Sequence, residues 1–233
     1  MPRILSYFFV MFISFSAYVN AENIENERIL TIYGFMGSNL DMYYHSWTLE
    51  EQNMQVKNWD YPTREKKINE HAEDLVVYLQ DWAAEAPGKP IHFLTHSMGG
   101  LVLRAAISHP DCPPEAKIGK AVLLAPPNKG TVWGRMLSGY FLPEWIAGDE
   151  SGREILSEHD FEYLGQFPDT KKVMVIAGNL SLNPLIEGEN DGTVKVDETY
   201  LITPHYHGVV YESHKTILIS KETTELMMDF FRS

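Results

Sequence analysis

A serine with the setting of a nucleophile lies in the middle of the chain. Ser97 stands in residues 95–100 (Thr-His-Ser-Met-Gly-Gly), directly after a short apolar run and directly before a stretch with helical spacing. A serine on such a strand–turn–helix junction is pushed into the open, and the unpaired N–H groups at the helix start favour negative charge beside it. Gly99 leaves the space that a tight turn needs. The pattern predicts a nucleophile; the alternative is a serine that only caps the helix.

A serine hydroxyl becomes nucleophilic when a base takes its proton, and an acidic side chain orients that base. When the serine stands on such a turn, the acid and then the base follow it along the chain. Asp191, in residues 189–194 (Glu-Asn-Asp-Gly-Thr-Val), is the predicted acid, and Asp197 is the alternative. Asp-Gly pairs also form plain turns, so the assignment depends on finding a suitable histidine farther along.

Three of the nine histidines come after the predicted acid: His205, His207 and His214. His214 lies between a strand-like run and the last predicted helix, which is the place of the base in this arrangement. The other two flank a tyrosine and are expected at the surface or in a supporting role. His92 and His96 fall in or beside the strand before the serine, so we expect both to be structural.

Hydrolysis through a serine also needs two backbone N–H groups to hold the negatively charged oxygen of the intermediate. Met98, directly after the serine, is predicted to supply one of them. The loop of residues 33–38 (Tyr-Gly-Phe-Met-Gly-Ser) is predicted to supply the other, with Phe35 as the first choice and Met36 as the second. The alternative for this loop is a glycine-rich turn without a function; no phosphate-loop signature follows it.

The elements that must position these residues alternate along the chain. Apolar, β-branched runs predict strands at residues 29–33, 55–61, 91–95, 120–125 and 172–177, with edge candidates at 200–202 and 208–211. Apolar residues three and four apart predict helices at residues 65–86, 101–109 and 222–231, and residues 38–53 are loosely helical. Strands alternating with helices predict a mainly parallel sheet.

Residues 128–170 do not fit this alternation. They carry many aromatic and aliphatic side chains without a simple strand pattern. Loops longer than about 12–15 residues are uncommon in compact domains, so we interpret this stretch as an insertion that forms a small helical cap over the site. The alternative is a crossover helix with a long loop.

Five stretches together resemble the α/β-hydrolase superfamily, and within it small bacterial lipase- and esterase-like proteins. They lie at Gly34–Ser38, Thr95–Gly100, Leu124–Gly130, Asp191–Val194 and Ser213–His214. The order of the stretches is that of the family, and they span nearly the whole chain after its first apolar segment. The set is specific for the fold and for serine hydrolysis but does not define a substrate.

The resemblance implies an α/β-hydrolase fold, a mainly parallel sheet flanked by helices. It further implies hydrolysis of carboxyl esters through Ser97, His214 and Asp191, with a small-molecule or lipid ester as substrate and no metal or organic cofactor. An acyltransferase, an amidase or peptidase, and a catalytically silent binding module are the alternatives. Two residues depart from the family pattern: Tyr33 replaces a histidine, and Thr95 replaces the first glycine of the turn.

Composition and the N-terminal segment bear on partners and location. The net charge of −13 argues against a nucleic-acid partner. An apolar stretch of residues 4–19 follows Arg3 and ends in Val-Asn-Ala, which predicts a signal peptide at residues 1–21 and one domain at 22–233. The stretch is shorter than the roughly 20 residues of a membrane span, so we expect cleavage, no stable membrane span afterwards, and a secreted or periplasmic protein. An uncleaved anchor is the alternative. Cys112 is the only cysteine in the sequence and is expected to be a bystander thiol.

Overall fold

The computed structural model describes residues 24–131, 150–158, 160–181 and 183–233. Its centre is a six-stranded sheet in the order β2-β1-β3-β4-β5-β6, and all five strand pairs are parallel. The strands are β1 (Arg28–Ile32), β2 (Gln55–Asn58), β3 (Ile91–His96), β4 (Ala121–Leu124), β5 (Val173–Gly178) and β6 (Tyr206–Val210). The predicted parallel sheet is therefore confirmed. Because the strands are parallel, the loops that follow them gather at one edge of the sheet.

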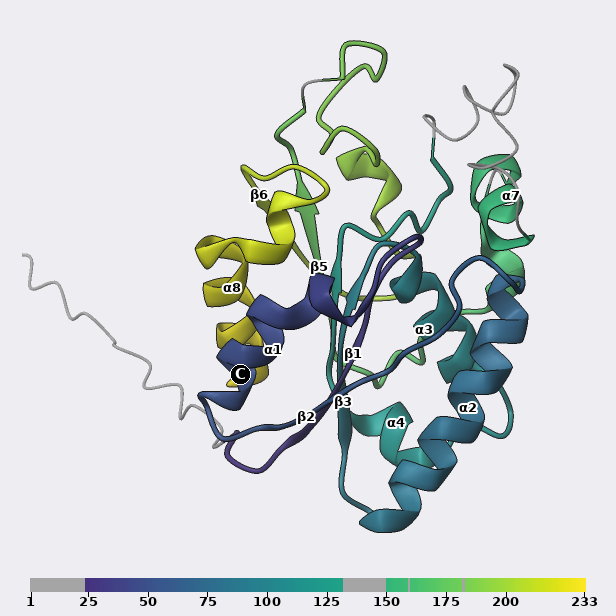
Figure 1. Cartoon of the computed structure of the whole chain (residues 1–233), viewed down its shortest axis with the longest axis vertical. Helices are drawn as coiled ribbons and strands as arrows, with labels where there is room; N and C mark the ends of the chain where they lie inside the picture. The colour runs from purple at the N-terminus through teal and green to yellow at the C-terminus, as the bar shows by residue number, and fades with distance from the viewer. Residues whose placement is uncertain (1–23, 132–149, 159, 182) are drawn as a thin grey trace, which may run out of the picture.

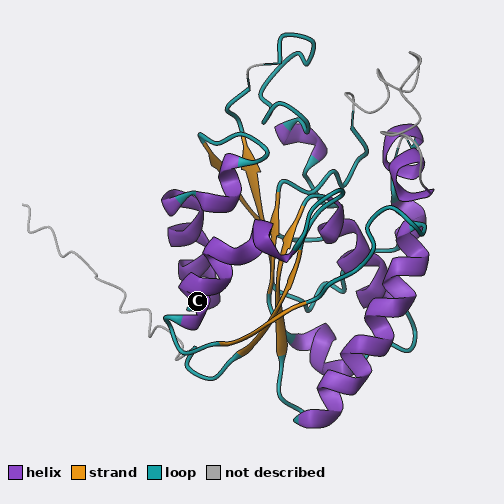
Figure 2. Ribbon diagram, in the orientation of Figure 1, coloured by secondary structure: helices purple, strands orange, loops and turns teal. Residues whose placement is uncertain are grey.

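Helices cover both faces of the sheet (Figures 1 and 2). The helices are α1 (Tyr43–Glu50), α2 (Ile68–Glu85), α3 (Met98–Ser108), α4 (Pro114–Ile118), α7 (Glu150–Ser157) and α8 (Lys221–Phe231). Short 3-10 turns are η1 (Asn39–Met42), η2 (Glu162–Leu164), η3 (Val196–Glu198) and η4 (Thr216–Ile219). In Figure 1, α1 and α8 lie on one face, and α2, α3 and α4 lie on the other. The result is a three-layer arrangement typical of α/β proteins.

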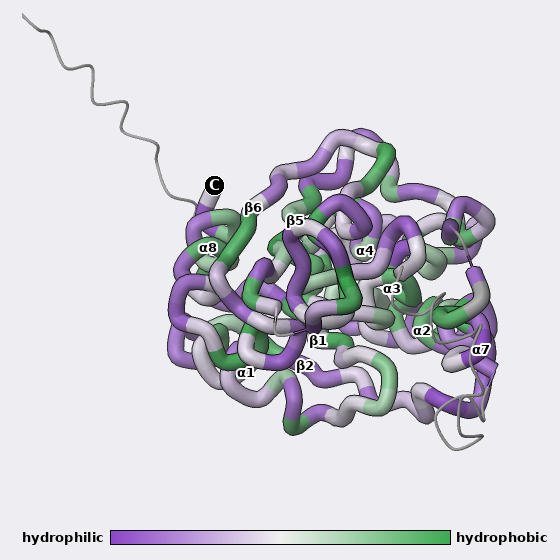
Figure 3. The backbone as a smooth tube through the Cα atoms, turned by 90° about the horizontal axis from the view of Figure 1, so that it is seen from above, coloured by the Kyte–Doolittle hydropathy of each residue, from purple (hydrophilic) through white to green (hydrophobic). Residues whose placement is uncertain are grey.

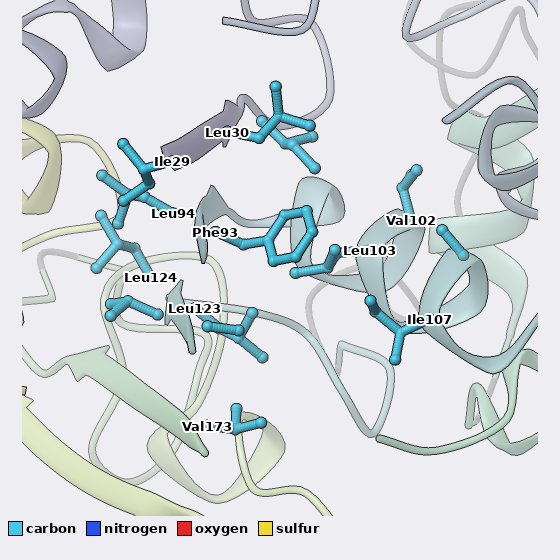
Figure 4. Packing of buried hydrophobic residues seen from close by; sticks show 14 of the residues in the cluster. Ile29, Leu30, Phe93, Leu94, Val102, Leu103, Ile107, Leu123, Leu124 and Val173 are labelled. Carbon is cyan, nitrogen blue, oxygen red and sulfur yellow. The ribbon is translucent and has the colours of Figure 1, made fainter. Parts of the chain in front are cut away.

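One part of the hydrophobic core lies between α3 and the central strands. Leu30, Phe93 and Ala121 are in register on neighbouring strands, and all three are fully buried. Figure 4 shows Phe93 packed beside Leu103 of α3. Every residue of α3 from Met98 to Ile107 is buried, and the view from above places this largely hydrophobic helix in the interior of the molecule (Figure 3). The nucleophile candidate thus starts a helix that is fixed by packing on all sides.

Element boundaries differ from the sequence prediction in a few places. α3 begins at Met98 and not at residue 101, because the turn at Ser97 passes directly into the helix. β2 ends at Asn58, before the predicted end at residue 61. Its next residues leave the sheet to stack, with the rings of Trp59 and Tyr61 4.5 Å apart. Residues 200–202 form no strand, whereas the other edge candidate is part of β6.

The predicted cap falls only partly within the described chain. Residues 132–149 and 159 lie outside the described residues, as does the predicted signal peptide at 1–21. The described remainder of the insertion contains α7 and η2. Glu154 of α7 accepts a hydrogen bond from the Ile68 N–H at 2.8 Å, which satisfies a free donor at the start of α2. This contact holds α7 at the edge of the sheet where the loops gather (Figure 1).

Candidate active site

Ser97 lies on a strained turn between β3 and α3. Its φ is 52° and its ψ is −124°, a conformation that residues with a side chain rarely adopt. Such a residue costs about 1–3 kcal/mol and persists when its surroundings hold it in place. Here the Ser97 N–H donates to the Leu124 carbonyl at 2.8 Å, and the Ser97 carbonyl accepts from the Gly100 N–H at 3.0 Å. The turn therefore presents the hydroxyl at the carboxyl end of β3.

Small residues let this turn pack closely. A Cβ on Gly99 would lie 2.6 Å from the carbonyl oxygens of Ile32 and Tyr33, so no side chain fits there. Thr95, in place of the family's first glycine, is fully buried. Its hydroxyl lies 3.3 Å from where a Cβ of Gly100 would be, so the space of the missing side chain at Gly100 accommodates the threonine. The turn thus has room for the threonine, although its hydroxyl is buried with no hydrogen-bond partner among the described residues.

The structure brings the three predicted triad residues together. His214 Nε2 lies 3.0 Å from Ser97 Oγ, and His214 Nδ1 lies 2.6 Å from Asp191 Oδ2. The carboxylate can only accept, so Nδ1 carries the hydrogen and Nε2 is free to accept the serine proton. These distances match what a base needs to remove that proton.

Backbone hydrogen bonds hold both the side chain and the carbonyl of Asp191. It is 2% exposed, and its Oδ1 accepts hydrogen bonds from the N–H groups of Thr193 at 2.9 Å and Val194 at 2.7 Å. Its backbone carbonyl accepts the His214 N–H at 2.9 Å. A Cβ on Gly178 would lie 3.0 Å from Asp191 Cβ, so the turn that carries Asp191 packs tightly on the end of β5. Asp197, the alternative acid, lies in η3, and the carboxylate at His214 Nδ1 is that of Asp191.

The two other late histidines have partners elsewhere. His207 Nε2 lies 2.9 Å from Thr199 Oγ1, and its ring stacks on Tyr200 with centroids 3.9 Å apart. Burial, together with nearby His205, lowers the pKa of His207 to about 4. His205 Nδ1 donates to the Thr203 carbonyl at 2.8 Å. These contacts place both residues in a cluster around Tyr200, whereas the histidine beside Ser97 is His214.

The loop after β1 forms a turn beside the serine. The Gly37 N–H donates to the Gly34 carbonyl at 3.0 Å, and Met36 has a φ of 55°. A Cβ on Gly34 would lie 2.8 Å from Ser97 Cβ, so a side chain here would displace the serine. The Met36 N–H donates to Thr63 Oγ1 at 3.1 Å. That amide therefore has its own partner, and Phe35 stays the predicted donor toward Ser97.

Tyr33 fastens this loop to the end of β2. Its hydroxyl lies 2.6 Å from Asp60 Oδ1 and accepts the Tyr61 N–H at 2.8 Å. The Tyr61 hydroxyl donates back to the Tyr33 carbonyl at 2.8 Å, and the two rings stack at 4.9 Å. Burial and the neighbouring Asp60 raise the pKa of Tyr33 to about 12, so the hydroxyl stays protonated. The tyrosine therefore braces the loop from the position where the family has a histidine.

A cavity of about 240 Å³ opens on the serine and histidine. Its lining is mainly apolar and comes from the loop after β1, the segment after β4, the turn that carries Asp191, and α7. The apolar lining residues are Phe35, Met36, Pro127, Ile155, Leu156 and Val194. The two α7 residues were not identified individually in the sequence, where only the general apolar character of the insertion was visible. Ser97 and His214 lie in the wall of the same cavity.

Within the described residues, no cluster of three or more His, Cys, Asp or Glu side chains could hold a metal ion. The same part of the chain has no helix long and apolar enough to cross a membrane. Cys112 is buried and unpaired, and burial raises the pKa of its thiol to about 11. A thiol in that state is a poor nucleophile.

No protein-family model and no curated protein sequence matches the chain. Solved structures do resemble it. The lipase BlEst2 from Bacillus licheniformis, in its mature form, has a TM-score of 0.69 and 16% identity over 91% of this chain and 94% of that one. Phospholipase PlaB from Legionella pneumophila has a TM-score of 0.65 and 15% identity over 89% of this chain and 60% of that one. Esterase Pf2001 from Pyrococcus furiosus has a TM-score of 0.59 and 19% identity over 89% of this chain and 83% of that one. The chain has the α/β-hydrolase fold.

Proposed function

We propose that this protein is a serine hydrolase that cleaves carboxyl esters through an acyl-enzyme. The observation that carries the proposal is the connected set Ser97–His214–Asp191, with contacts of 3.0 and 2.6 Å, at the wall of an apolar cavity. The strained turn under Ser97 adds to it, since such strain persists where the surroundings enforce it and is common at reactive residues. The likeness to a lipase, a phospholipase and an esterase is consistent with this chemistry.

In the first half of the proposed reaction, His214 Nε2 accepts the Ser97 proton while Oγ attacks the ester carbonyl carbon. The carbonyl oxygen becomes an oxyanion, which the N–H groups of Phe35 and Met98 hold. The intermediate then collapses, the bond to the alcohol breaks, and His214 gives its proton to the departing alcohol oxygen. Asp191 keeps the imidazole in the required tautomer and offsets its transient charge.

In the second half, a water molecule takes the place of the alcohol. His214 removes a proton from the water as it attacks the acyl carbon, and the same proton returns to Ser97 Oγ when the acid leaves. The protein groups that this cycle uses need no metal or organic cofactor. An acyltransferase would replace the water by another acceptor, and acceptor-dependent product formation would reveal it.

The cavity supports an ester with an apolar part as the substrate. Its mainly apolar walls suit an acyl chain or a hydrophobic alcohol, and Ser97 and His214 lie in the same wall. We therefore propose a small-molecule or lipid ester. A silent binding module of the same fold would not require the three triad residues to be connected, and their hydrogen bonds argue against it.

We also propose that the protein is exported, with residues 1–21 removed as a signal peptide. The apolar segment and the Val-Asn-Ala sequence support this. Expression of the full chain in a bacterial host, followed by fractionation and N-terminal sequencing, tests it. A mature N-terminus at Glu22 in the periplasm or medium is expected, and an intact N-terminus in the cytoplasm would contradict export.

Turnover of p-nitrophenyl esters by the protein of residues 22–233 tests the catalytic proposal. We expect steady hydrolysis by the wild type and loss of at least about 10³-fold in kcat for Ser97→Ala and for His214→Ala. Ser108→Ala is the matched control, because that hydroxyl bonds the Gln166 carbonyl away from the site. A well-folded wild type without turnover on esters of short, medium and long acyl chains would refute the proposal.

A further inference from the structure

His96, the last residue of β3, touches the base as well as preceding the nucleophile. It is 2% exposed, and its Nε2 lies 2.9 Å from the backbone carbonyl oxygen of His214. The two imidazole rings lie side by side, with centroids 4.8 Å apart and planes tilted by 48°. A residue next to Ser97 in the chain thus contacts the backbone that carries the base, 118 positions away.

The hydrogen-bond partner of His96 shows which ring nitrogen carries the hydrogen. A carbonyl oxygen only accepts hydrogen bonds, so Nε2 of His96 carries the hydrogen and donates it. Burial first, and then the neighbouring His214, lower the pKa of His96 well below its ordinary value. His96 is therefore neutral, and a neutral ring with its hydrogen on Nε2 has only a lone pair at Nδ1. A neutral neighbour also avoids repelling the imidazolium that forms at His214 during the proposed reaction.

The other side of the His96 ring meets the loop after β1. A Cβ on Gly34 would lie 3.1 Å from His96 Nδ1 and 2.8 Å from Ser97 Cβ. The bare backbone of Gly34 therefore lies against both residues. One buried ring thus lies between the loop that carries the predicted oxyanion donor and the loop that carries the base.

From this geometry we infer that His96 is a positioning residue, whose Nε2–H holds the His214 backbone so that the imidazole stays aligned with Ser97; the inference rests on the proposed function. The His214 N–H donates to the Asp191 carbonyl, and the His214 carbonyl accepts from His96, so both polar groups of this backbone unit are fixed. Without the second bond, the carbonyl end of the residue can move. Misplacement of a catalytic group by about 1 Å costs about 100-fold in rate.

The test compares His96→Gln with His96→Met. The two new side chains have similar length and volume, but only glutamine offers an N–H at the reach of Nε2. We expect His96→Met to lower kcat on p-nitrophenyl butyrate about 10- to 100-fold with KM changed less than about twofold. Because the glutamine amide restores the donor, kcat of His96→Gln should stay within about fivefold of the wild type.

His45→Met is the matched control. His45 is fully buried, its Nε2 lies 3.0 Å from the Ile217 carbonyl, and its Nδ1 lies 3.2 Å from Thr224 Oγ1. The control therefore loses the same kind of bond to a backbone carbonyl, three residues beyond His214 and not at His214 itself. Circular dichroism and thermal unfolding measure the structural cost of each change. We expect a comparable loss of Tm in His45→Met and His96→Met, but a lowered kcat of the folded protein only in the latter.

Three results would overturn the inference. One is a folded His96→Met with the kcat of the wild type, and another is an equal loss of kcat in His96→Met and His96→Gln. The third needs no variant: long-range ¹H–¹⁵N NMR of the wild type should show His96 neutral with its hydrogen on Nε2, and the other tautomer would exclude the bond. A wild type without esterase activity but with this tautomer would instead refute the proposed function.

Discussion

Replacing Asp191 by asparagine changes the triad in a way that the structure specifies. Oδ1 of Asp191 accepts two backbone N–H groups, from Thr193 and Val194, and Oδ2 accepts His214 Nδ1–H. In the Asp191→Asn variant, the amide oxygen must take the position of Oδ1, because the two backbone donors need an acceptor. The amide NH₂ group is thereby turned toward His214 Nδ1.

An NH₂ group at this position reverses the tautomer of the base. His214 Nδ1 must then accept, so the ring hydrogen moves to Nε2, which faces Ser97 Oγ at 3.0 Å and no longer accepts the serine proton. We expect kcat to fall about 10³- to 10⁴-fold with little change in KM. At 1.36 kcal/mol for each factor of ten, this is a barrier increase of about 4–5.5 kcal/mol. The shape of the side chain is kept, so the free energy of unfolding should fall by only about 1–2 kcal/mol.

The assay is steady-state hydrolysis of p-nitrophenyl butyrate at pH 8, with urea unfolding to confirm the fold. Asp197→Asn is the control, because that residue lies in η3 and was the alternative acid from the sequence. Its kcat should stay within about twofold of the wild type, since the carboxylate at His214 is that of Asp191. A folded Asp191→Asn protein with kcat within about tenfold of the wild type would refute the reasoning.

Further changes test the packing and the electrostatics. In Gly99→Ala the new Cβ would lie 2.6 Å from two carbonyl oxygens, so we expect the free energy of unfolding in urea to fall by about 2–4 kcal/mol. A fall of less than about 1 kcal/mol would show that the turn is not packed this closely. Thr63→Val removes the acceptor of the Met36 N–H and should lower kcat about tenfold at constant KM. An unchanged kcat would show that this hydrogen bond does not affect catalysis. Burial lowers the pKa of Lys171 to about 7 from 10.5, so between these values the unfolded chain binds the extra proton and stability rises with pH. From pH 7 to 9 the wild type should gain about 2 kcal/mol relative to Lys171→Met, and parallel stability profiles would show that the amine keeps its ordinary pKa.

The sheet could be predicted because its strands are short apolar runs that period and composition reveal. Residues 91–95 and 120–125 form β3 and β4 nearly as predicted, since strands buried on both faces consist of continuous apolar residues. The long stripe of residues 65–86 likewise gives α2. Edges were harder: β6 is largely exposed, so its pattern carries little of the apolar signal.

The candidate site could be predicted in part from the sequence, because its residues follow the strands in a fixed chain order. Parallel strands bring the ends of β3 and β5 to one edge of the sheet, and this topology is why local motifs around Ser97 and Asp191 could be combined. The sequence predicted Phe35 before Met36 as the oxyanion donor, but it could not show what the Met36 N–H bonds. Thr63, 27 residues away, accepts that hydrogen bond, and no motif marks it.

Long-range contacts of single polar atoms left no signal in the sequence. His96 was assigned a structural role because it ends a strand, and its bond to the His214 carbonyl follows only from the folded arrangement. Tyr33 departs from the family pattern, yet its stacking and hydrogen bonds with Tyr61 brace the loop by another route. Such replacements are compensated in three dimensions and cannot be judged from one position alone.

The most direct test of the central claim is covalent labelling of the protein of residues 22–233 with a fluorophosphonate, followed by intact mass and peptide mapping. The probe reacts with a serine whose hydroxyl is activated by a base, so we expect one adduct, on Ser97, and slow or absent labelling in His214→Ala. Labelling of Ser108→Ala should equal that of the wild type. A folded wild-type protein that remains unlabelled, or an adduct on another serine, would contradict the account.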